Sequence, residues 1–315
     1  MIADPRCREV FEGQPYIDAV WLLRRGGGPL AQARAWSALI ARARRESPDL
    51  VLDLYGSKRT ALVSRLSGAR WRIGLHRQGS SRWYNPLERL SEPLSKQGHL
   101  IQRINSAVVA AGISAPFAYC GLPVSEADRA GVSAVLAERG LDSVAHLVVL
   151  NPAARVAAKQ WPPERFGGLA ERLWSRERTR CGVISSPDAP ALTEAVVGAS
   201  QGAAVALPPL ALRRLAALLE RASLLVSGDT GVLHVGSAMG TPAVILSGPT
   251  SPDLVACPAC PQVILFDRDA CPHWETGSEC ARYNDCLDRR CIDAITMEET
   301  LDAVTDLLGR VEGRR

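Results

Sequence analysis

The sequence predicts an α/β protein made of two halves, each containing a parallel sheet. Short apolar runs of strand length alternate along the chain with amphipathic segments of helix length, which is typical of parallel sheets covered by helices. The length of 315 residues suits one large domain or two medium ones. We place the division near residue 124, so that residues 1–124 form an N-terminal domain and residues 125–315 form a C-terminal domain.

In the first half the predicted elements are short. The predicted strands are residues 18–23, 50–54 and 71–75, and the predicted helices are residues 31–45, 59–66 and 99–111. Residues 79–100 are polar and contain two prolines, which predicts a loop. Three consecutive glycines at 26–28 indicate a flexible turn, and no G-x-G-x-x-G phosphate loop follows a strand.

In the second half the signals are clearer. Ser125 and Asp128 predict the start of a helix, with a hydroxyl cap and an acid three residues later. The predicted strands are residues 146–150, 223–226 and 243–246, and the predicted helices start at residues 162–163 and cover 215–221, 232–239 and 298–308. Sheets of this kind bind ligands beyond the carboxyl ends of their strands, often in a cleft between domains.

Composition indicates a soluble, cytoplasmic protein with an uneven charge. Charged residues make up 22% of the chain, no apolar run has the length of a membrane span, and the N-terminus has no basic segment followed by an apolar stretch, as a signal peptide would. The net charge is +4, yet residues 51–100 hold nine Lys or Arg against three Asp or Glu. Such a stretch indicates an anionic partner, such as phosphate, carboxylate, lipid or nucleic acid, or else a basic face that only meets solvent.

The strongest motif follows the predicted strand 223–226 and opens a helix. It runs Ser-Gly-Asp229-Thr230-Gly231-Val-Leu-His234 and continues to Gly-Thr-Pro at 240–242. Glycines let a ligand approach the backbone, and the N–H groups at a helix start attract negative charge, so a diphosphate would suit this turn. The alternative is a tight turn in which Asp229 caps the helix and His234 packs against a neighbour.

Two further motifs follow predicted strands and therefore fall on the same edge of the sheet. The first is Asn-Pro-Ala-Ala at 151–154 followed by Lys159-Gln-Trp-Pro, in which Lys159 is suited to neutralise a phosphate, although a solvent-exposed lysine is the simpler interpretation. The second is the turn Ser-Gly-Pro-Thr-Ser-Pro at 247–252, which is a weak signal by itself.

Taken together and in this order, these motifs resemble glycosyltransferase family 9, the ADP-heptose:lipopolysaccharide heptosyltransferases. That family's pattern is N-P-G-A, K-x-W-P, D-T-G-x-x-H-x-A-x-A-x-G-x-P and a G-x-T turn. This chain departs from it at Ala153, where glycine is usual, and at Gly236, where alanine is usual. Asp53-Leu-Tyr-Gly and Arg72-Ile-Gly also resemble the family's D-x-Q-G and R-x-G-F segments.

The resemblance implies a GT-B fold, in which two Rossmann-like domains face each other across a cleft, and an inverting transfer that needs neither metal nor cofactor. The C-terminal domain would hold a nucleotide-sugar donor, ADP-heptose, and the N-terminal domain the anionic core of lipopolysaccharide. Nucleic acid is not an expected partner, and membrane contact would be peripheral, on the cytoplasmic face of the inner membrane. The donor residues would be Lys159, Asp229, Thr230, Gly231 and His234, and the acceptor residues Lys58, Arg59, Arg72, Arg77 and Arg82.

The catalytic base is the main departure from the family. Family members begin with a strand and a Gly-Asp loop whose aspartate would be the base, whereas residues 1–5 of this chain match the family's second strand. We therefore expect the first strand-helix unit to be missing and the base to lie upstream of Met1. Asp53 is the one strand-end carboxylate of the first half that would substitute. The alternatives are an inactive protein that only binds nucleotide-sugars, or a transferase with another sugar donor.

Six of the nine cysteines lie between residues 257 and 291, with spacing C-x2-C-x10-C-x8-C-x5-C-x4-C. Only one C-x2-C pair is present, so reduced thiols, a zinc or iron-sulfur site and disulfides all remain open. A metal- or redox-dependent module built on this tail is accordingly a third class of function. Asp267 and Asp269 form a D-x-D pair, a common pattern to which we assign no metal.

Overall fold

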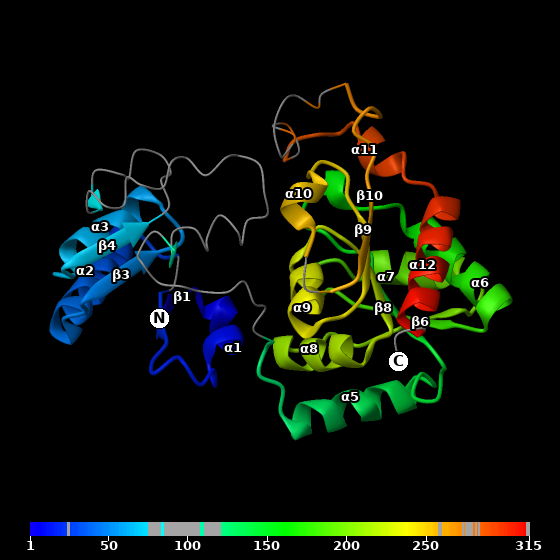
Figure 1. The fold of residues 1–315 in the computed structure, drawn as a ribbon, viewed down its shortest axis with the longest axis horizontal. Coiled ribbons are helices and arrows are strands. Elements are labelled where there is room, and N and C mark those ends of the chain that lie inside the picture. Colours follow the sequence, from blue (N-terminus) through cyan, green and yellow to red (C-terminus); the bar gives the residue numbers. More distant parts are fainter. Residues whose placement is uncertain are drawn as a thin grey trace. The chain divides into compact units, whose positions relative to one another are not determined.

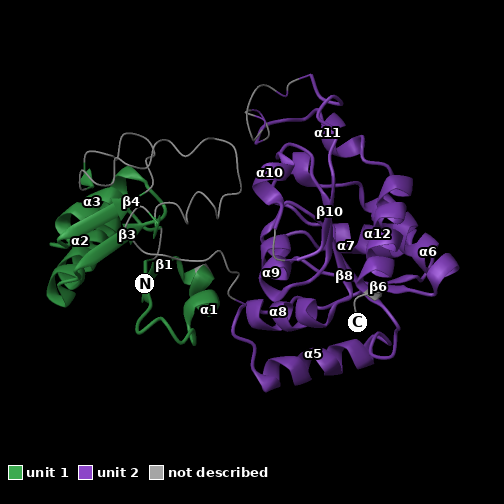
Figure 2. Ribbon diagram, viewed as in Figure 1, with its two compact units in different colours: residues 1–118 green, residues 119–315 purple. Residues whose placement is uncertain are grey.

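In a computed structural model of the protein, the chain divides into two compact units, residues Met1–Ala118 and Tyr119–Arg315 (Figure 2). The sequence places this division a few residues later, at 124. The structure describes residues 1–23, 26–74, 83–84, 108–109, 121–257, 260–272, 274, 280, 282 and 284–312. The second unit contains one six-stranded sheet with helices packed on both of its faces.

The sheet of the second unit has six parallel strands. They are β5 (Leu147–Asn151), β6 (Arg180–Val183), β7 (Ala204–Ala206), β8 (Leu224–Gly228), β9 (Ala243–Leu246) and β10 (Gln262–Leu265). Their spatial order is β10-β9-β8-β5-β6-β7. Numbered within the unit and read from β7 to β10, this is 3-2-1-4-5-6, the doubly wound Rossmann order, whose direction of winding reverses between β5 and β8.

Helices cover both faces of this sheet (Figure 1). One face packs against α6 (Pro163–Glu177), α7 (Pro190–Ala199) and α12 (Met297–Glu312), and the other against α5 (Glu126–Glu138), α8 (Leu212–Arg221) and α9 (Gly231–Met239). Successive residues of β5 alternate between the two cores: Val148 and Leu150 belong to the first, Leu147 and Val149 to the second. Burial on both faces explains why β5 is a continuous apolar run.

The capped start of α5 is confirmed, because the Ser125 hydroxyl accepts a hydrogen bond from the Asp128 N–H and the Asp128 carboxylate accepts one from the Ser125 N–H. The predicted strands β5, β8 and β9 and helices α6, α8, α9 and α12 are also present. No expectation covers β6, α7 or β7; the strands β6 and β7 have only four and three residues and no extended apolar run. The described part of the unit also has two short helices, α10 (Pro252–Val255) and α11 (Arg290–Asp293), and the 3-10 helix η4 (Ala157–Lys159).

The first unit contains two separate parallel pairs of strands. β1 (Ile2–Ala3) pairs with β2 (Trp21–Leu22), and β3 (Leu50–Asp53) pairs with β4 (Trp71–Gly74). The helices among its described residues include η1 (Pro5–Cys7), α1 (Arg8–Phe11), α2 (Pro29–Glu46) and α3 (Lys58–Leu66). Only two residues of the predicted strand 18–23 are paired. The predicted loop 79–100 and helix 99–111 lie outside the described residues, apart from residues 83–84 and 108–109.

Membrane insertion would require a helix that is both long and apolar. Among the described residues, no helix combines the length and the apolar character needed to cross a lipid bilayer.

Candidate functional site

The main candidate site lies at the carboxyl ends of β5, β8 and β9, where the winding of the sheet reverses (Figure 1). Asp229 and Thr230 connect β8 to α9, and Thr230 is the N-cap residue of that helix. Thr230 has an extended backbone, and its side chain makes no cap hydrogen bond. The first N–H groups of a helix have no partner within the helix, so the start of α9 presents partial positive charge at this edge of the sheet.

Asp229 is the centre of a small polar cluster. Its Oδ2 accepts hydrogen bonds from Lys159 Nζ at 2.5 Å and from Thr250 Oγ1 at 3.0 Å. Its Oδ1 lies 3.7 Å from Nε2 of His234, one turn into α9. The cluster thus unites the ends of three strands, and Asp229 holds Lys159 rather than capping the helix.

The exposure of these side chains differs. The Lys159 and Asp229 side chains are each only 14% exposed, whereas the His234 side chain is 51% exposed. Of the 37 basic residues in the chain, only three are lysines, which makes a partly buried lysine at this position distinctive. An ammonium group is a compact charge on a flexible stem, so it can exchange one anionic partner for another more readily than a planar guanidinium.

A second hydrogen-bonded group lies beside this cluster. Asn151, at the end of β5, donates through Nδ2 to Ser227 Oγ at 2.9 Å and to Thr230 Oγ1 at 3.0 Å. The Ser227 and Thr230 hydroxyls are 3.3 Å apart. These bonds join β5 to the turn after β8 and fix the backbone that leads into α9.

The C-terminal segment holds the loop that carries Lys159 through hydrogen bonds. Trp161 is 2% exposed and donates through Nε1 to the Ile295 carbonyl at 2.8 Å. Arg289 donates to the carbonyl of Gln160, the residue after Lys159, at 2.5 Å. Trp161 and the Gln160 carbonyl therefore anchor the loop to the C-terminal segment.

Two glycines allow the backbone segments of the site to meet. A Cβ on Gly228 would lie 2.8 Å from the Lys159 carbonyl oxygen, and a Cβ on Gly248 would lie 2.9 Å from the Ala158 carbonyl oxygen. No side chain larger than hydrogen fits at either place without displacement of the Lys159 loop. These close approaches explain the glycines of two of the three motifs.

Three residues that the structure brings into the site were not assigned to it from the sequence: Asn151, Ser227 and Thr250. All three stand in the motifs described above, but polar residues near the end of a strand have many possible partners. Thr250 is 2% exposed and Ser227 is fully buried. Because buried hydroxyls require a hydrogen-bond partner, two hydroxyls next to a buried strand were the available signal.

In the first unit, the Asp53 carboxylate is fully engaged by its neighbours. It is 7% exposed, and Oδ1 accepts hydrogen bonds from the N–H groups of Tyr55 and Gly56. Its Oδ2 accepts one from the Tyr84 hydroxyl at 2.7 Å. A Cβ on Gly74 would overlap the Tyr84 ring, so the glycine of the Arg72-Ile-Gly segment makes room for this contact. Such a carboxylate closes a turn and is poorly placed to take a proton from an acceptor.

The predicted acceptor residues have different surroundings. Lys58 and Arg59 are exposed and occupy the first turn of α3, which contains no acidic residue. Arg72 donates to the carbonyls of Ala69 at 2.7 Å and Trp83 at 3.4 Å, so part of its guanidinium is used within the fold. Arg77 and Arg82 lie outside the described residues.

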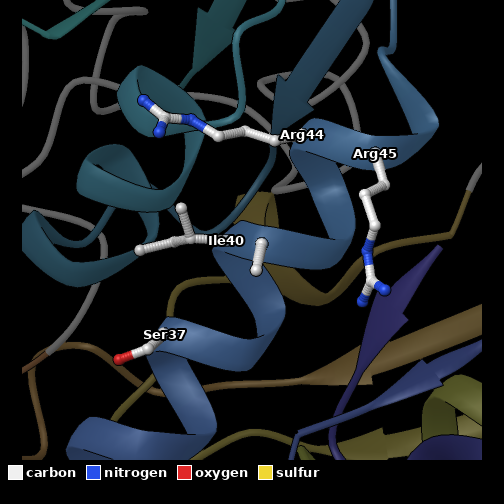
Figure 3. A pocket seen from close by; sticks show the side chains of 5 residues that line it. Ser37, Ile40, Arg44 and Arg45 are labelled. Carbon is white, nitrogen blue, oxygen red and sulfur yellow. The ribbon is translucent and has the colours of Figure 1, made fainter.

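An open hollow in the first unit lies along α2, lined by Ser37, Ile40, Ala41, Arg44 and Arg45 (Figure 3). The Arg44 guanidinium donates to the Leu66 carbonyl at 2.8 Å, which ties α2 to the end of α3. None of the predicted site residues lines this hollow, and we assign it no ligand.

The cysteines of the tail are free thiols wherever the structure describes them. Cys257, Cys260, Cys271, Cys280 and Cys291 are buried and Cys286 is partly buried. Burial, followed by the neighbouring Cys257, raises the pKa of Cys260 to about 12. In the described part of the chain, no three His, Cys, Asp or Glu side chains are arranged to hold a metal ion. The Asp267 carboxylate accepts hydrogen bonds from the N–H groups of Asp269 and Ala270, so it closes a turn.

Comparison with known proteins agrees with the motifs and the fold. A family model described as glycosyltransferase family 9 (heptosyltransferase) matches residues 36–280. The chain belongs to glycosyltransferase family 9. The family's usual Gly at 153 is replaced here without strain, since Ala153 is not among the described non-glycine residues with positive φ. Gly236 packs closely on Leu225, whose Cδ2 would lie 3.0 Å from an added Cβ.

Among curated relatives, lipopolysaccharide heptosyltransferase 1 of Pseudomonas aeruginosa is 28% identical over 253 residues. The match covers 75% of this chain and 64% of that protein, so the chain spans less than two thirds of its length.

Two solved structures confirm the expected GT-B fold class. A family 9 glycosyltransferase from Veillonella parvula has a TM-score of 0.77 at 21% identity, covering 98% of this chain and 87% of its own. The Escherichia coli ADP-heptose lipopolysaccharide heptosyltransferase II has a TM-score of 0.73 at 20% identity, covering 99% and 89%. At these identities the likeness concerns the fold alone.

Proposed function

We propose that this chain is an inverting glycosyltransferase that moves heptose from ADP-heptose to a lipopolysaccharide core acceptor. The observation that supports this proposal best is the cluster of Lys159, Asp229 and Thr250 beside the start of α9. A cation next to a helix N-terminus at the switch point of a Rossmann-like sheet suits a nucleotide diphosphate. Family membership and the ADP-heptose donor of the E. coli relative support the choice of sugar.

The chemistry follows from where charge develops. An acceptor hydroxyl attacks the anomeric carbon, the bond from that carbon to the diphosphate breaks, and negative charge grows on the leaving diphosphate. The Lys159 ammonium and the N–H groups of Thr230 and Gly231 would stabilise that charge, as fixed donors do in a site from which water is excluded. His234, exposed one turn further along α9, would contact the same diphosphate or the sugar.

The first unit would bind the acceptor. Lys58 and Arg59 are exposed at the positive end of α3, where the helix N-terminus and both side chains attract the same anion. Arg72 would contribute less, because two backbone carbonyls already use its guanidinium. Since the hydrogen bonds of Asp53 leave it poorly suited to act as the base, we propose that another group deprotonates the acceptor hydroxyl.

The test is calorimetric binding of ADP-heptose, ADP, UDP and GDP to the wild-type protein and to Lys159→Ala and Asp229→Ala. The proposal requires preference for ADP and ADP-heptose, weakened by both substitutions. Lys58→Ala is the matched control, because it removes a lysine of the first unit and should leave donor affinity unchanged. Equal binding of all three nucleotides, or none, would overturn the choice of donor.

Turnover separates the enzyme from a protein that only binds nucleotide-sugars. Transfer from ADP-heptose to a heptose-deficient lipopolysaccharide acceptor should release ADP, and Lys58→Ala with Arg59→Ala should raise the KM for that acceptor. Binding of ADP-heptose without ADP release over hours would favour the inactive alternative.

A further inference from the structure

Thr250 occupies a position that the proposed donor chemistry has not yet used. Its hydroxyl donates to the same carboxylate oxygen, Oδ2 of Asp229, that pairs with the Lys159 ammonium. The carbonyl of Thr250 accepts a hydrogen bond of 2.6 Å from the fully buried Ser247 hydroxyl at the end of β9. The turn after β9 therefore holds the Thr250 hydroxyl against Asp229.

The pairing of Lys159 with Asp229 creates a cost for donor binding. An ammonium that turns its N–H groups toward a diphosphate shares its charge between two anions and weakens its contact with Asp229. Because the Asp229 side chain is only 14% exposed, water replaces that contact poorly. Removing a charged donor from a partly buried carboxylate oxygen is destabilising unless another donor stays with that oxygen.

We propose that Thr250 is a positioning residue, which holds Asp229 in place and lets Lys159 move from that carboxylate to the diphosphate of the donor. The hydroxyl remains on Oδ2 when the ammonium leaves, so the carboxylate keeps a partner throughout. Thr250 acts through Asp229 and need not touch the donor. This inference rests on the proposed function, because it assumes that Lys159 binds a diphosphate.

The choice of lysine at 159 agrees with this exchange. Only three of the 37 basic residues in the chain are lysines, and Lys159 is the one that pairs with Asp229. An arginine would make a fixed, two-pronged contact with the carboxylate and would release it less readily.

The first experiment compares Thr250→Val with Thr250→Ser by calorimetry with ADP and AMP. Valine keeps the shape of threonine but lacks the hydroxyl, so the Kd for ADP should rise about tenfold, which corresponds to about 1.4 kcal/mol. Serine keeps the hydroxyl and should restore ADP affinity to within about twofold of the wild type, on the same scale. The Kd for AMP, which lacks the second phosphate, should change less.

A buried hydroxyl elsewhere in the same unit supplies the control. Thr241 is 3% exposed, lies before the opposite end of β9 and donates to the Leu219 carbonyl at 2.7 Å. Thr241→Val should lower thermal stability without a selective effect on ADP. Equal ADP affinities in Thr250→Val and Thr241→Val would overturn the proposal.

A double-mutant cycle tests whether Thr250 acts through Lys159. In a Lys159→Ala background, Thr250→Val should weaken ADP binding much less than it does in the wild type, because no ammonium has to leave Asp229. Additive losses would refute the mechanism even if both single variants bind weakly. If Lys159→Ala weakens ADP binding and Thr250→Val does not, only the role of Thr250 fails. If the wild-type protein binds no ADP, the proposed function fails and this inference with it.

Discussion

Gly228, the last residue of β8, offers a direct way to disturb the candidate site without removing any of its polar groups. A Cβ at this position would lie 2.8 Å from the Lys159 carbonyl oxygen and 3.7 Å from the Leu246 carbonyl oxygen. The first separation is too short for a carbon and an oxygen that are not bonded, whereas the second is an ordinary contact. The substitution Gly228→Ala must therefore displace the Lys159 loop or the end of β8.

The magnitude follows from how both segments are held. The contact has to open by roughly half an ångström, and a methyl group forced into a packed region typically costs about 1–3 kcal/mol. Trp161 and Arg289 fasten the loop to the C-terminal segment, and β8 is hydrogen-bonded on both sides, so neither moves freely. If half of that cost falls on the position of Lys159, ADP affinity should drop by between about twofold and about twelvefold.

The assay is calorimetry with ADP together with a thermal melt of the same sample. We expect Gly228→Ala to lower both the affinity and the melting temperature, by about 2–4 °C for each kcal/mol lost. Gly168→Ala in α6 is the control, because its Cβ would meet no atom within 4 Å. That control should bind ADP normally and be slightly more stable, since alanine favours a helix more than glycine does. Wild-type affinity and stability in Gly228→Ala would refute the close approach of the two segments.

Two further predictions concern the C-terminal segment. Trp161→Phe removes the Nε1 donor to the Ile295 carbonyl and part of a buried ring. In urea unfolding, the free energy of unfolding should fall by about 1–3 kcal/mol. An unchanged urea midpoint would contradict the anchoring role of Trp161. Burial, with Cys271, Cys286 and Cys280 adding to it, raises the pKa of Cys291 to about 11, so only about one thiol in a thousand is ionised at pH 8. Peptide mapping after brief alkylation at pH 8 should find the exposed Cys7 modified and Cys291 intact. Cys291 should be alkylated faster as the pH rises toward 11. Equal labelling of the two cysteines at pH 8 would contradict the burial of Cys291.

Local signals in the sequence were sufficient for the second unit where each element is long or strongly patterned. The first four residues of β5 are all apolar because both faces of the strand are buried, and α5 begins at a capping box that lies within four consecutive residues. β6 could not be predicted, because its four residues include an arginine and a glycine and become a strand only beside β5. Its pairing is a property of the assembled sheet rather than of its own residues.

The candidate site shows the same division between local and distant information. The glycines and the helix start after β8 are local signals, so the turn between β8 and α9 was predictable. The Asp229 cluster is not, because Lys159 lies 70 positions before Asp229 and Thr250 lies 21 after it. The residues around Lys159 and those around Thr250 carry no local signal that both side chains contact Oδ2 of Asp229. The doubly wound strand order brings them together, and that order emerges only when all six strands pair.

This dependence on topology also explains why charge alone was a poor guide in the first unit. Arg72 and Asp53 lie on paired strands, at the positions where the family resemblance and the basic stretch directed attention. Both side chains instead satisfy backbone and tyrosine groups within the fold. Lys58 and Arg59 differ because α3 places them at its own positive end, where like charges repel and no acidic side chain of the first turn offsets them. Cations that the fold itself does not neutralise are better candidates for an anionic ligand than cations that merely lie in a basic stretch.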